Sequence, residues 1–223
     1  MSGALRGLLI DVDGTLIDSN DAHADAWVAA LREAGRAATF EQVRPLIGMG
    51  SDKMLPRLTG LAEDDPAAAA LVEGKKRHFA RMLPSLRPFA GTRPLLERLR
   101  DQGLELVVAT SAGSEEATAL LEQAGVADLM SRQTSSSDAD NSKPDPDIVR
   151  SALRKGGLSA ATALMLGDTP YDVEAATRAG VRAIALRCGG WWDDRSLGGA
   201  VAIYDDPADL LARLADSPLG AGG

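Results

Sequence analysis

Short apolar strands that alternate with helices are the feature that most limits how this chain can fold. An apolar run lies at residues 8–10, and from Gly91 onwards strand and helix patterns alternate regularly. Strands are predicted at residues 104–109, 128–134, 163–166, 182–186 and 200–204, and helices at 93–102, 115–123, 145–155, 171–179 and 207–214. Because continuously apolar strands are buried on both faces, the pattern predicts an α/β protein with a doubly wound parallel sheet.

A helical segment interrupts this alternation between the first strand and the second. Helical spacing begins after Asp18 and lasts for about seventy residues. Within it, helices are predicted from residue 19 or 20 to Gly35, and at residues 40–47, 53–58 and 66–82. We therefore expect a core domain at residues 1–18 and 88–216, a small α-helical domain at residues 19–87, and a disordered tail at residues 217–223.

The composition limits the kinds of partner that this chain can bind. Its 223 residues carry a formal net charge of −8, which is the opposite of the basic surface that nucleic acids require. Cys188 is the single cysteine, so an internal disulfide framework is excluded. No apolar run approaches the length of a membrane span, and the first strand begins too early to leave room for a signal peptide. We expect a cytoplasmic monomer or homodimer that acts on a small molecule, without nucleic acid or membrane partners.

Two carboxylates follow the first predicted strand in the sequence D-V-D-G-T. In extended backbone, residues two apart point to the same side, so Asp11 and Asp13 can face one site. Paired carboxylates repel each other unless a cation holds them, and Mg²⁺ prefers oxygen ligands. An EF-hand calcium loop is excluded, because glycine is fourth in this segment and Leu16 occupies the sixth position. An ordinary polar turn after a strand stays open as an alternative.

Three further polar groups follow other predicted elements of the core. Thr110 and Ser111 come after one strand and just before a helix, which is typical of an oxyanion site but also of a helix cap. Lys143 precedes a proline-fixed turn, and Asp168 and Asp172 follow a third apolar strand. Alone, Lys143 would be interpreted as a solvated loop residue and Asp168 as a helix cap. Because parallel strands end at one edge of a sheet, the groups together are those needed to bind a phosphoryl group beside Mg²⁺.

These four motifs, in this order, resemble those of the haloacid dehalogenase superfamily of phosphohydrolases, and the resemblance covers nearly the whole chain. The first motif is D-V-D-G-T-L-I-D from Asp11, the second is Thr110, the third is Lys143 in S-K-P, and the fourth is G-D-T-P-Y-D. The resemblance implies a Rossmann-like core with the small α-helical cap of this superfamily. Within the superfamily, the chain resembles the group of phosphoglycolate phosphatases and β-phosphoglucomutase-like proteins.

The resemblance also implies roles for the carboxylates. Asp11 is expected to be the nucleophile that forms an aspartyl-phosphate. Asp13 is expected to protonate the leaving oxygen and then to deprotonate the hydrolytic water. The carboxylates of Asp11 and Asp168, with the backbone carbonyl of Asp13, are expected to ligate Mg²⁺. Dehalogenases and phosphonatases lack the acid at the position of Asp13, so its presence favours cleavage of a phosphate ester.

The remaining core motifs are implied to bind the phosphoryl group. Thr110, Ser111 and Lys143 are expected to hold its oxygens. Asp172 is expected to support Lys143 or the metal site. These roles complete a Mg²⁺ site and a phosphate site at one edge of the sheet.

Residues of the helical segment are expected to contact the substrate. His23 resembles a histidine near the active-site entrance of β-phosphoglucomutase-like proteins, although a structural role for it stays open. Lys53 follows the glycine-flanked loop at residues 48–50 and is a candidate substrate contact. Its spacing also resembles that of a Schiff-base lysine in phosphonatases, an interpretation that Asp13 opposes. The charged run at residues 75–81 is predicted to be a solvated helix face, and two roles stay open for Trp191 and Trp192, local packing or a wall of the site.

The sequence therefore predicts a Mg²⁺-dependent phosphatase that hydrolyses a small phosphate monoester through an aspartyl-phosphate. The main alternative is a phosphosugar mutase that returns the phosphoryl group to a substrate hydroxyl. A phosphonatase and a non-catalytic binding protein are further alternatives. Phosphoglycolate, a small sugar phosphate and a nucleotide all stay open as substrates.

Overall fold

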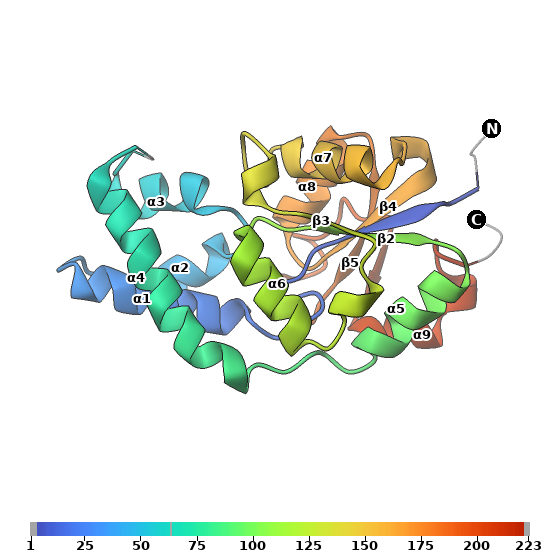
Figure 1. Cartoon of the computed structure of the whole chain (residues 1–223), viewed down its shortest axis with the longest axis horizontal. Coiled ribbons are helices and arrows are strands. Elements are labelled where there is room, and N and C mark those ends of the chain that lie inside the picture. The colour runs from blue at the N-terminus through green and yellow to red at the C-terminus, as the bar shows by residue number, and fades with distance from the viewer. Residues whose placement is uncertain (1–3, 63, 221–223) are drawn as a thin grey trace.

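A six-stranded parallel sheet forms the centre of the molecule. The computed structural model describes residues 4–62 and 64–220, and its strands lie in the order β3-β2-β1-β4-β5-β6. The strands are β1 (Gly7–Ile10), β2 (Glu105–Ala109), β3 (Arg132–Thr134), β4 (Ala163–Gly167), β5 (Arg182–Leu186) and β6 (Ala202–Tyr204). The prediction of a doubly wound parallel α/β sheet is confirmed (Figure 1).

The order of the strands decides where a ligand can bind. β1 pairs in parallel with both β2 and β4, with Ile10 in register with Val108 on one side and Leu166 on the other. The chain runs towards β2 and β3 on one side of β1, and towards β4, β5 and β6 on the other. Ligands of such sheets bind beyond the carboxyl ends of the strands where this direction changes. The segments after β1, β2 and β4 therefore meet at the expected ligand-binding edge.

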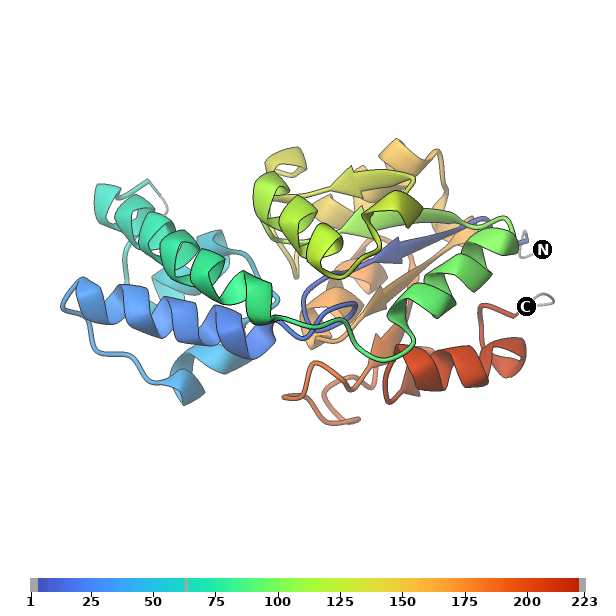
Figure 2. The same cartoon turned by 60° about the horizontal axis from the view of Figure 1, so that its bottom comes forward.

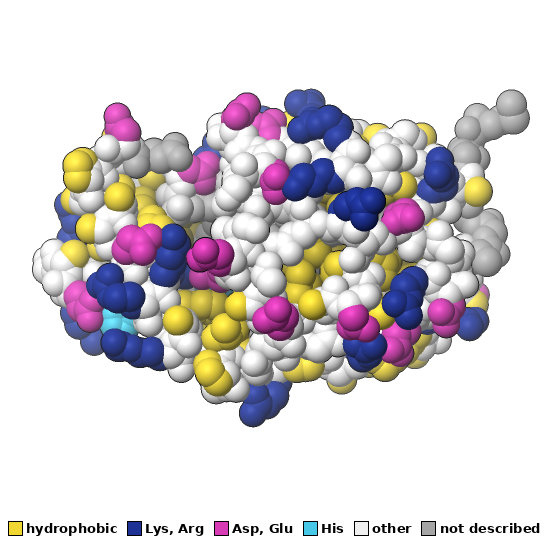
Figure 3. All heavy atoms as spheres, in the orientation of Figure 1, with side chains coloured by type: hydrophobic (Ala, Val, Ile, Leu, Met, Phe, Trp, Pro, Cys, Tyr) yellow, Lys and Arg dark blue, Asp and Glu magenta, His cyan; other side chains and the backbone are white. Residues whose placement is uncertain are grey.

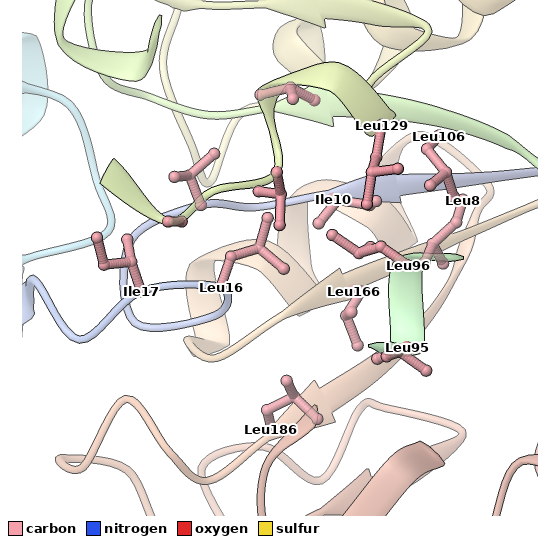
Figure 4. Packing of buried hydrophobic residues seen from close by; sticks show 14 of the residues in the cluster. Leu8, Ile10, Leu16, Ile17, Leu95, Leu96, Leu106, Leu129, Leu166 and Leu186 are labelled. Carbon is pink, nitrogen blue, oxygen red and sulfur yellow. The ribbon is translucent and has the colours of Figure 1, made fainter. Parts of the chain in front are cut away.

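Helices cover both faces of the sheet because successive strand residues point to opposite sides. The helices of the core are α5 (Thr92–Asp101), α6 (Ser114–Gln123), α7 (Asp147–Gly156), α8 (Pro170–Arg178) and α9 (Pro207–Ala212). Leu8 and Ile10 of β1 pack with leucines of α5, α6 and α9, as Figure 4 shows for Leu95 and Leu96. Leu9 points the other way and packs with apolar residues of α7 and α8.

Four helices lie beside the carboxyl edge of the sheet, and we call residues 19–87 the cap region. They are α1 (Asn20–Glu33), α2 (Phe40–Val43), α3 (Ser51–Thr59) and α4 (Pro66–Met82). α1 and α4 pack side by side, and the region has its own apolar core, which includes Trp27, Met54 and Leu71 (Figures 1 and 2). In the described part of the chain, no helix combines the length and the apolar character needed to cross a membrane.

Two local predictions differ from the structure. β3 begins only at Arg132, because Ala127–Leu129 forms a 3-10 turn that buries Leu129 in the core. The disorder predicted at residues 217–223 is wrong for residues 217–220. The Ser217 hydroxyl donates to the carbonyl of Leu214 at 2.8 Å, and Leu219 is buried in the core. A single leucine among small residues did not indicate in the sequence that this segment packs on the core. Residues 221–223 lie outside the described residues.

Candidate active site

A buried lysine joins two aspartates at the carboxyl edge of the sheet. The ammonium of Lys143 donates to Asp11 Oδ1 at 2.6 Å and pairs with Asp172 Oδ1 at 2.7 Å, and its side chain is 0% exposed. Asp11 comes directly after β1, and Asp172 lies in the first turn of α8. With Asp168, these aspartates offer carboxylate oxygens that all lie within 4.8 Å of one another. The structure thus brings together groups from three separate motifs.

Asp168 is oriented by one side chain of the first motif, Thr15, and by one that follows it, Asn20. The Asn20 amide donates to Asp168 Oδ2 at 2.8 Å, and the Thr15 hydroxyl donates to Asp168 Oδ1 at 3.2 Å. Gly14 lies beside this contact with φ +70°, and a Cβ there would collide with Asn20 and Asp168. Gly189 also lies against Asp168, because a Cβ on Gly189 would overlap the Asp168 carboxylate. Glycine at these two positions lets the backbone close around Asp168.

The cluster holds more negative charge than its one lysine can neutralise. Burial and the neighbouring charge of Asp172 raise the pKa of Asp168 to about 7. Burial also raises the pKa of Asp11, and the charges of Asp172 and Asp168 add to this effect although Lys143 opposes it. Carboxylates that resist ionisation in this way favour a cation among them, and hard oxygen ligands suit Mg²⁺. The cluster formed by Asp11, Asp168 and Asp172 therefore fits a divalent metal ion.

Asp13 has a different environment from the other acids. Its Oδ1 accepts hydrogen bonds from His23 Nε2 at 2.6 Å and from the Ser19 hydroxyl at 2.5 Å. Burial alone would raise the pKa of Asp13, but the charge and hydrogen bond of His23 and the hydrogen bond of Ser19 lower it to about 2. One oxygen of the Asp13 carboxylate, Oδ1, is thus held by the cap region, and the backbone carbonyl of Asp13 stays the group predicted to ligate the metal.

The loop after β2 offers hydroxyl groups beside the start of α6. Thr110 is 1% exposed, and its backbone N–H donates to the carbonyl of Thr134 at 3.2 Å. Its hydroxyl accepts from the N–H of Ala112 at 3.1 Å. Within residues 4–62 and 64–220, the buried Ser111 hydroxyl has no hydrogen-bond partner. A group with unused hydrogen bonds is suited to a phosphoryl oxygen, so Thr110 and Ser111 stay predictions as phosphate contacts.

Lys53 is engaged by the core rather than extended towards a substrate. Its ammonium donates to Asp145 Oδ2 at 2.5 Å, and Asp145 also pairs with Arg178 at 2.7 Å. The neighbouring Asp52 accepts a hydrogen bond from the Ser142 hydroxyl, next to Lys143. The first turn of α3 is thereby fastened to the segment that carries Lys143. The role of Lys53 as a substrate contact stays a prediction.

Sequence reasoning missed Arg44, which links the cap region to the loop beside Asp168. Arg44 is 2% exposed, donates to the carbonyl of Gly189, and pairs with Asp21 at 2.6 Å. Its guanidinium also lies 5.7 Å from the ring centroid of Trp191. The sequence predicted a helix here but contained no signal for which face of it would meet the core.

Sequence reasoning also misjudged Lys75, which was predicted to lie on a solvated helix face. Lys76 is exposed and pairs with Glu73, as a solvated residue does, but Lys75 is only 7% exposed and donates to both oxygens of Glu116 at 2.9 and 2.7 Å. The missed signal is spacing, because Leu71, Lys75 and Phe79 recur every four residues and thus share the buried face of α4.

The tryptophan pair after β5 packs locally and also contacts the cap region. Trp192 meets Tyr171 edge to face with ring centroids 6.0 Å apart, and the Tyr171 hydroxyl donates to the carbonyl of Pro45 at 2.6 Å. Trp191 is 40% exposed and meets Phe40 of α2 edge to face. These contacts support the packing role for both tryptophans and fasten the cap region next to the fourth motif.

Comparisons with known proteins agree with this geometry. The model of the family described as haloacid dehalogenase-like hydrolase matches residues 8–186. The chain is 32% identical over 214 residues to a phosphoglycolate phosphatase from Rhodospirillum rubrum, covering 92% of this chain and 89% of that protein. A hydrolase from Pseudomonas syringae has a similar structure, with a TM-score of 0.88 and 29% identity over 95% of this chain and 98% of that one. A β-phosphoglucomutase from Clostridium difficile shares the fold, with a TM-score of 0.81 and 16% identity over 92% of this chain and 93% of that one.

Proposed function

Because the chain belongs to the haloacid dehalogenase-like hydrolases, we propose that it is a Mg²⁺-dependent phosphatase that hydrolyses a small phosphate monoester through an aspartyl-phosphate. The observation that carries this proposal is the buried Lys143, which Asp11 and Asp172 share beside Asp168. Relatives named as phosphatases support hydrolysis of a phosphoric monoester.

Asp11 has the geometry of a nucleophile. Lys143 holds its Oδ1 at 2.6 Å, whereas Oδ2 accepts, from the described residues, only a long hydrogen bond of 3.4 Å from the Thr15 hydroxyl. The second oxygen is thus available to attack phosphorus. In this step the bond from Asp11 to phosphorus forms as the bond to the ester oxygen breaks, and Lys143 stays in place to neutralise the phosphoryl oxygens.

Asp13 and His23 are placed to move the protons of both steps. The leaving oxygen must gain a proton when it departs, and the attacking water must lose one when the aspartyl-phosphate is hydrolysed. Asp13 comes two residues after Asp11, and it shares a 2.6 Å hydrogen bond with His23. We assign Asp13 the exchange of protons with the leaving oxygen and the water, and His23 the role of holding the proton between steps.

The metal would be held by Asp11 and Asp168, with the backbone carbonyl of Asp13 as a further ligand. When bound, Mg²⁺ supplies positive charge that offsets the carboxylates and the phosphoryl oxygens. Asp172 would keep Lys143 in position through the 2.7 Å ion pair. Thr110 and Ser111 would hold the remaining phosphoryl oxygens from the loop after β2.

The cap region, residues 19–87, would close over the leaving group. It reaches the core at several places, through the contacts of His23, Arg44, Lys53 and Lys75 described above. The relative from Rhodospirillum rubrum makes phosphoglycolate the first substrate to test, beside small sugar phosphates and nucleotides. The cytoplasmic location, the monomer or homodimer and the lack of a nucleic-acid partner stay predictions.

A panel of phosphate esters tests the proposed function. Purified protein is incubated with each ester in Mg²⁺ or in EDTA, and both phosphate release and the remaining sugar phosphates are measured. We expect Mg²⁺-dependent release of phosphate from small monoesters, and none with the Asp11→Asn variant. An isomerised sugar phosphate without phosphate release would instead identify a mutase, and cleavage of phosphonoacetaldehyde a phosphonatase. Folded protein without any turnover would favour a binding protein.

A further inference from the structure

A buried ion pair joins the cap region to the core away from the acid cluster. The ammonium of Lys75, on α4, donates to both carboxylate oxygens of Glu116, in the first turn of α6. Figures 1 and 2 show α4 and α6 on opposite sides of the boundary between the cap region and the core. The side chains are only 9% and 18% exposed, respectively. Lys75 thus presents a desolvated ammonium to a carboxylate that approaches with both oxygens.

This ion pair lies next to the groups that would face the leaving group of a substrate. Lys75 Nζ is 4.7 Å from the ring centroid of Phe79, and Phe79 stacks on His23 with ring centroids 3.9 Å apart. His23 in turn holds Asp13, the proposed proton donor to the leaving oxygen. Glu116 lies a few residues beyond Ser111, in the helix that follows the proposed phosphate-binding loop. The pair therefore lies between the two parts of the site that a bound ester would connect.

The positive charge of Lys75 selects among possible leaving groups. A substrate carboxylate that replaced Glu116 on Lys75 would exchange one carboxylate for another, so the ammonium would keep a charged partner. With an uncharged leaving group, either the pair of Lys75 and Glu116 stays intact or the buried ammonium loses its charged partner. The second outcome is costly. Glu116 borders the more exposed Glu115 and can turn towards solvent once it is displaced.

We propose that Lys75 is the receptor for a carboxylate on the leaving group of the substrate, and that Glu116 occupies this receptor until the substrate displaces it. This inference rests on the proposed function and narrows its substrate class to small phosphate esters whose leaving group carries a carboxylate. Lys75 sets specificity, and Glu116 lowers the affinity of the free enzyme for its substrate by competing for the same ammonium.

The test compares two esters that differ in this one group, 2-phosphoglycolate and its analogue 2-hydroxyethyl phosphate, whose leaving group is uncharged. For wild type and variants, kcat/KM is measured on both esters, and their ratio reports carboxylate selectivity. Lys75→Met should lower this ratio by about tenfold to a hundredfold, because a charge-assisted hydrogen bond in a desolvated site is lost. Glu116→Gln should raise the ratio by about threefold to tenfold through a lower KM for phosphoglycolate, because a neutral amide competes less strongly.

Matched neighbours serve as controls, since Lys76 and Glu115 are exposed residues next to the two positions. Lys76→Met and Glu115→Gln should leave the ratio unchanged. Thermal unfolding of every variant shows whether it is folded. If Lys75→Met does not fold, Lys75→Arg, which keeps the charge, and Glu116→Gln decide the question. Equal effects on both esters, or no effect of Glu116→Gln on the ratio, would overturn the inference and leave Lys75 and Glu116 as a structural pair.

A binding experiment separates this inference from the proposed function. The Asp11→Asn variant, alone and combined with Glu116→Gln, is titrated with 2-phosphoglycolate in a calorimeter. We expect Glu116→Gln to tighten binding by about threefold to tenfold, as in the kinetic experiment. If wild type hydrolyses neither ester but Glu116→Gln tightens this binding, the proposed function fails and the carboxylate receptor stands. If both esters are hydrolysed but binding does not tighten, the receptor fails and the proposed function stands.

Discussion

The edge of the sheet and the cap region each use a lysine–aspartate contact, but the two contacts differ in what fixes them. Lys143 is 0% exposed and joins Asp11, which directly follows β1, to Asp172 in the first turn of α8, so both of its partners are held by elements of the buried core. Lys53 is 28% exposed and reaches Asp145 across the boundary between the cap region and the core. Breaking the first contact disturbs the proposed chemistry, and breaking the second disturbs the attachment of the cap region.

The two regions thus contribute in different ways to one site. The core supplies buried carboxylates whose negative charge exceeds the positive charge of Lys143 until a cation binds. The cap region supplies His23 and Lys75, whose contacts with the core depend on how its helices are docked. We expect substitutions at the sheet edge to abolish the chemistry, and those in the cap region to change which substrates react.

The largest expected effect is that of Asp11→Asn at the sheet edge. An amide is not a nucleophile towards phosphorus, so turnover should fall by at least about 10⁴-fold. The fold should be kept, because one of several crowded carboxylates loses its charge. Steady-state phosphate release and thermal unfolding measure the two outcomes. Asp18→Asn, at an exposed position of the same segment, is the control and should behave as wild type.

Asp13→Ala tests the boundary between the two regions, because Asp13 belongs to the core but is held by His23. General acid–base assistance supplies roughly 10²–10⁴-fold, and it matters most when the leaving oxygen is basic. Single-turnover phosphorylation should therefore slow far more with an alkyl phosphate than with p-nitrophenyl phosphate. An equal loss on both esters would show that Asp13 transfers no proton to the leaving group.

The two lysine contacts are compared directly by Lys143→Met and Lys53→Met in the absence of metal. Removal of one partner of a buried ion pair costs about 3–5 kcal/mol, and Lys143→Met should lower the free energy of unfolding by this amount. A partly exposed pair contributes about 0.2–1 kcal/mol, so Lys53→Met should cost less than about 1 kcal/mol. Urea unfolding at neutral pH measures both. Similar losses in the two variants would remove the distinction between the two regions.

The smallest expected effect is the pH dependence of metal binding. The pKa of Asp168 is raised from 3.8 to about 7 in the folded, metal-free protein. The folded state therefore loses stability relative to the unfolded chain as the pH rises through this interval. A bound cation removes that cost, and protons compete with it at low pH. The rise in Tm on adding Mg²⁺ should be larger at about pH 8 than at about pH 5. Asp168→Asn should weaken this dependence, and its persistence would locate the metal elsewhere.

Sequence patterns predicted the core well because the pairing of parallel strands restricts where the residues that follow them can lie. Once β1, β2 and β4 are neighbours, residues that directly follow them, such as Asp11, Thr110 and Asp168, must share one edge. The partner of Lys143 was predicted only as an alternative, since the loop before α7 contains no periodic pattern that would aim a side chain.

The cap region was less predictable because helix packing decides which face of a helix is buried. The run at residues 75–81 places charged side chains on several sides of the helix, and the packing of α4 buries Lys75 while it leaves Lys76 in solvent. Arg44 likewise depends on the distant loop at Gly189. Local sequence does not encode such contacts, because each requires two segments far apart in the chain to meet.

A single chemical trap tests the central claim, that Asp11 carries the phosphoryl group. Acid-quenched enzyme from the first turnover is treated with borohydride, which reduces an acyl phosphate to an alcohol, and the peptides are analysed by mass spectrometry. We predict homoserine at position 11, formed only when both substrate and Mg²⁺ are present. A reduced residue at Asp13 or Asp168, or a burst of phosphate with Asp11 unmodified at every time point, would contradict the account.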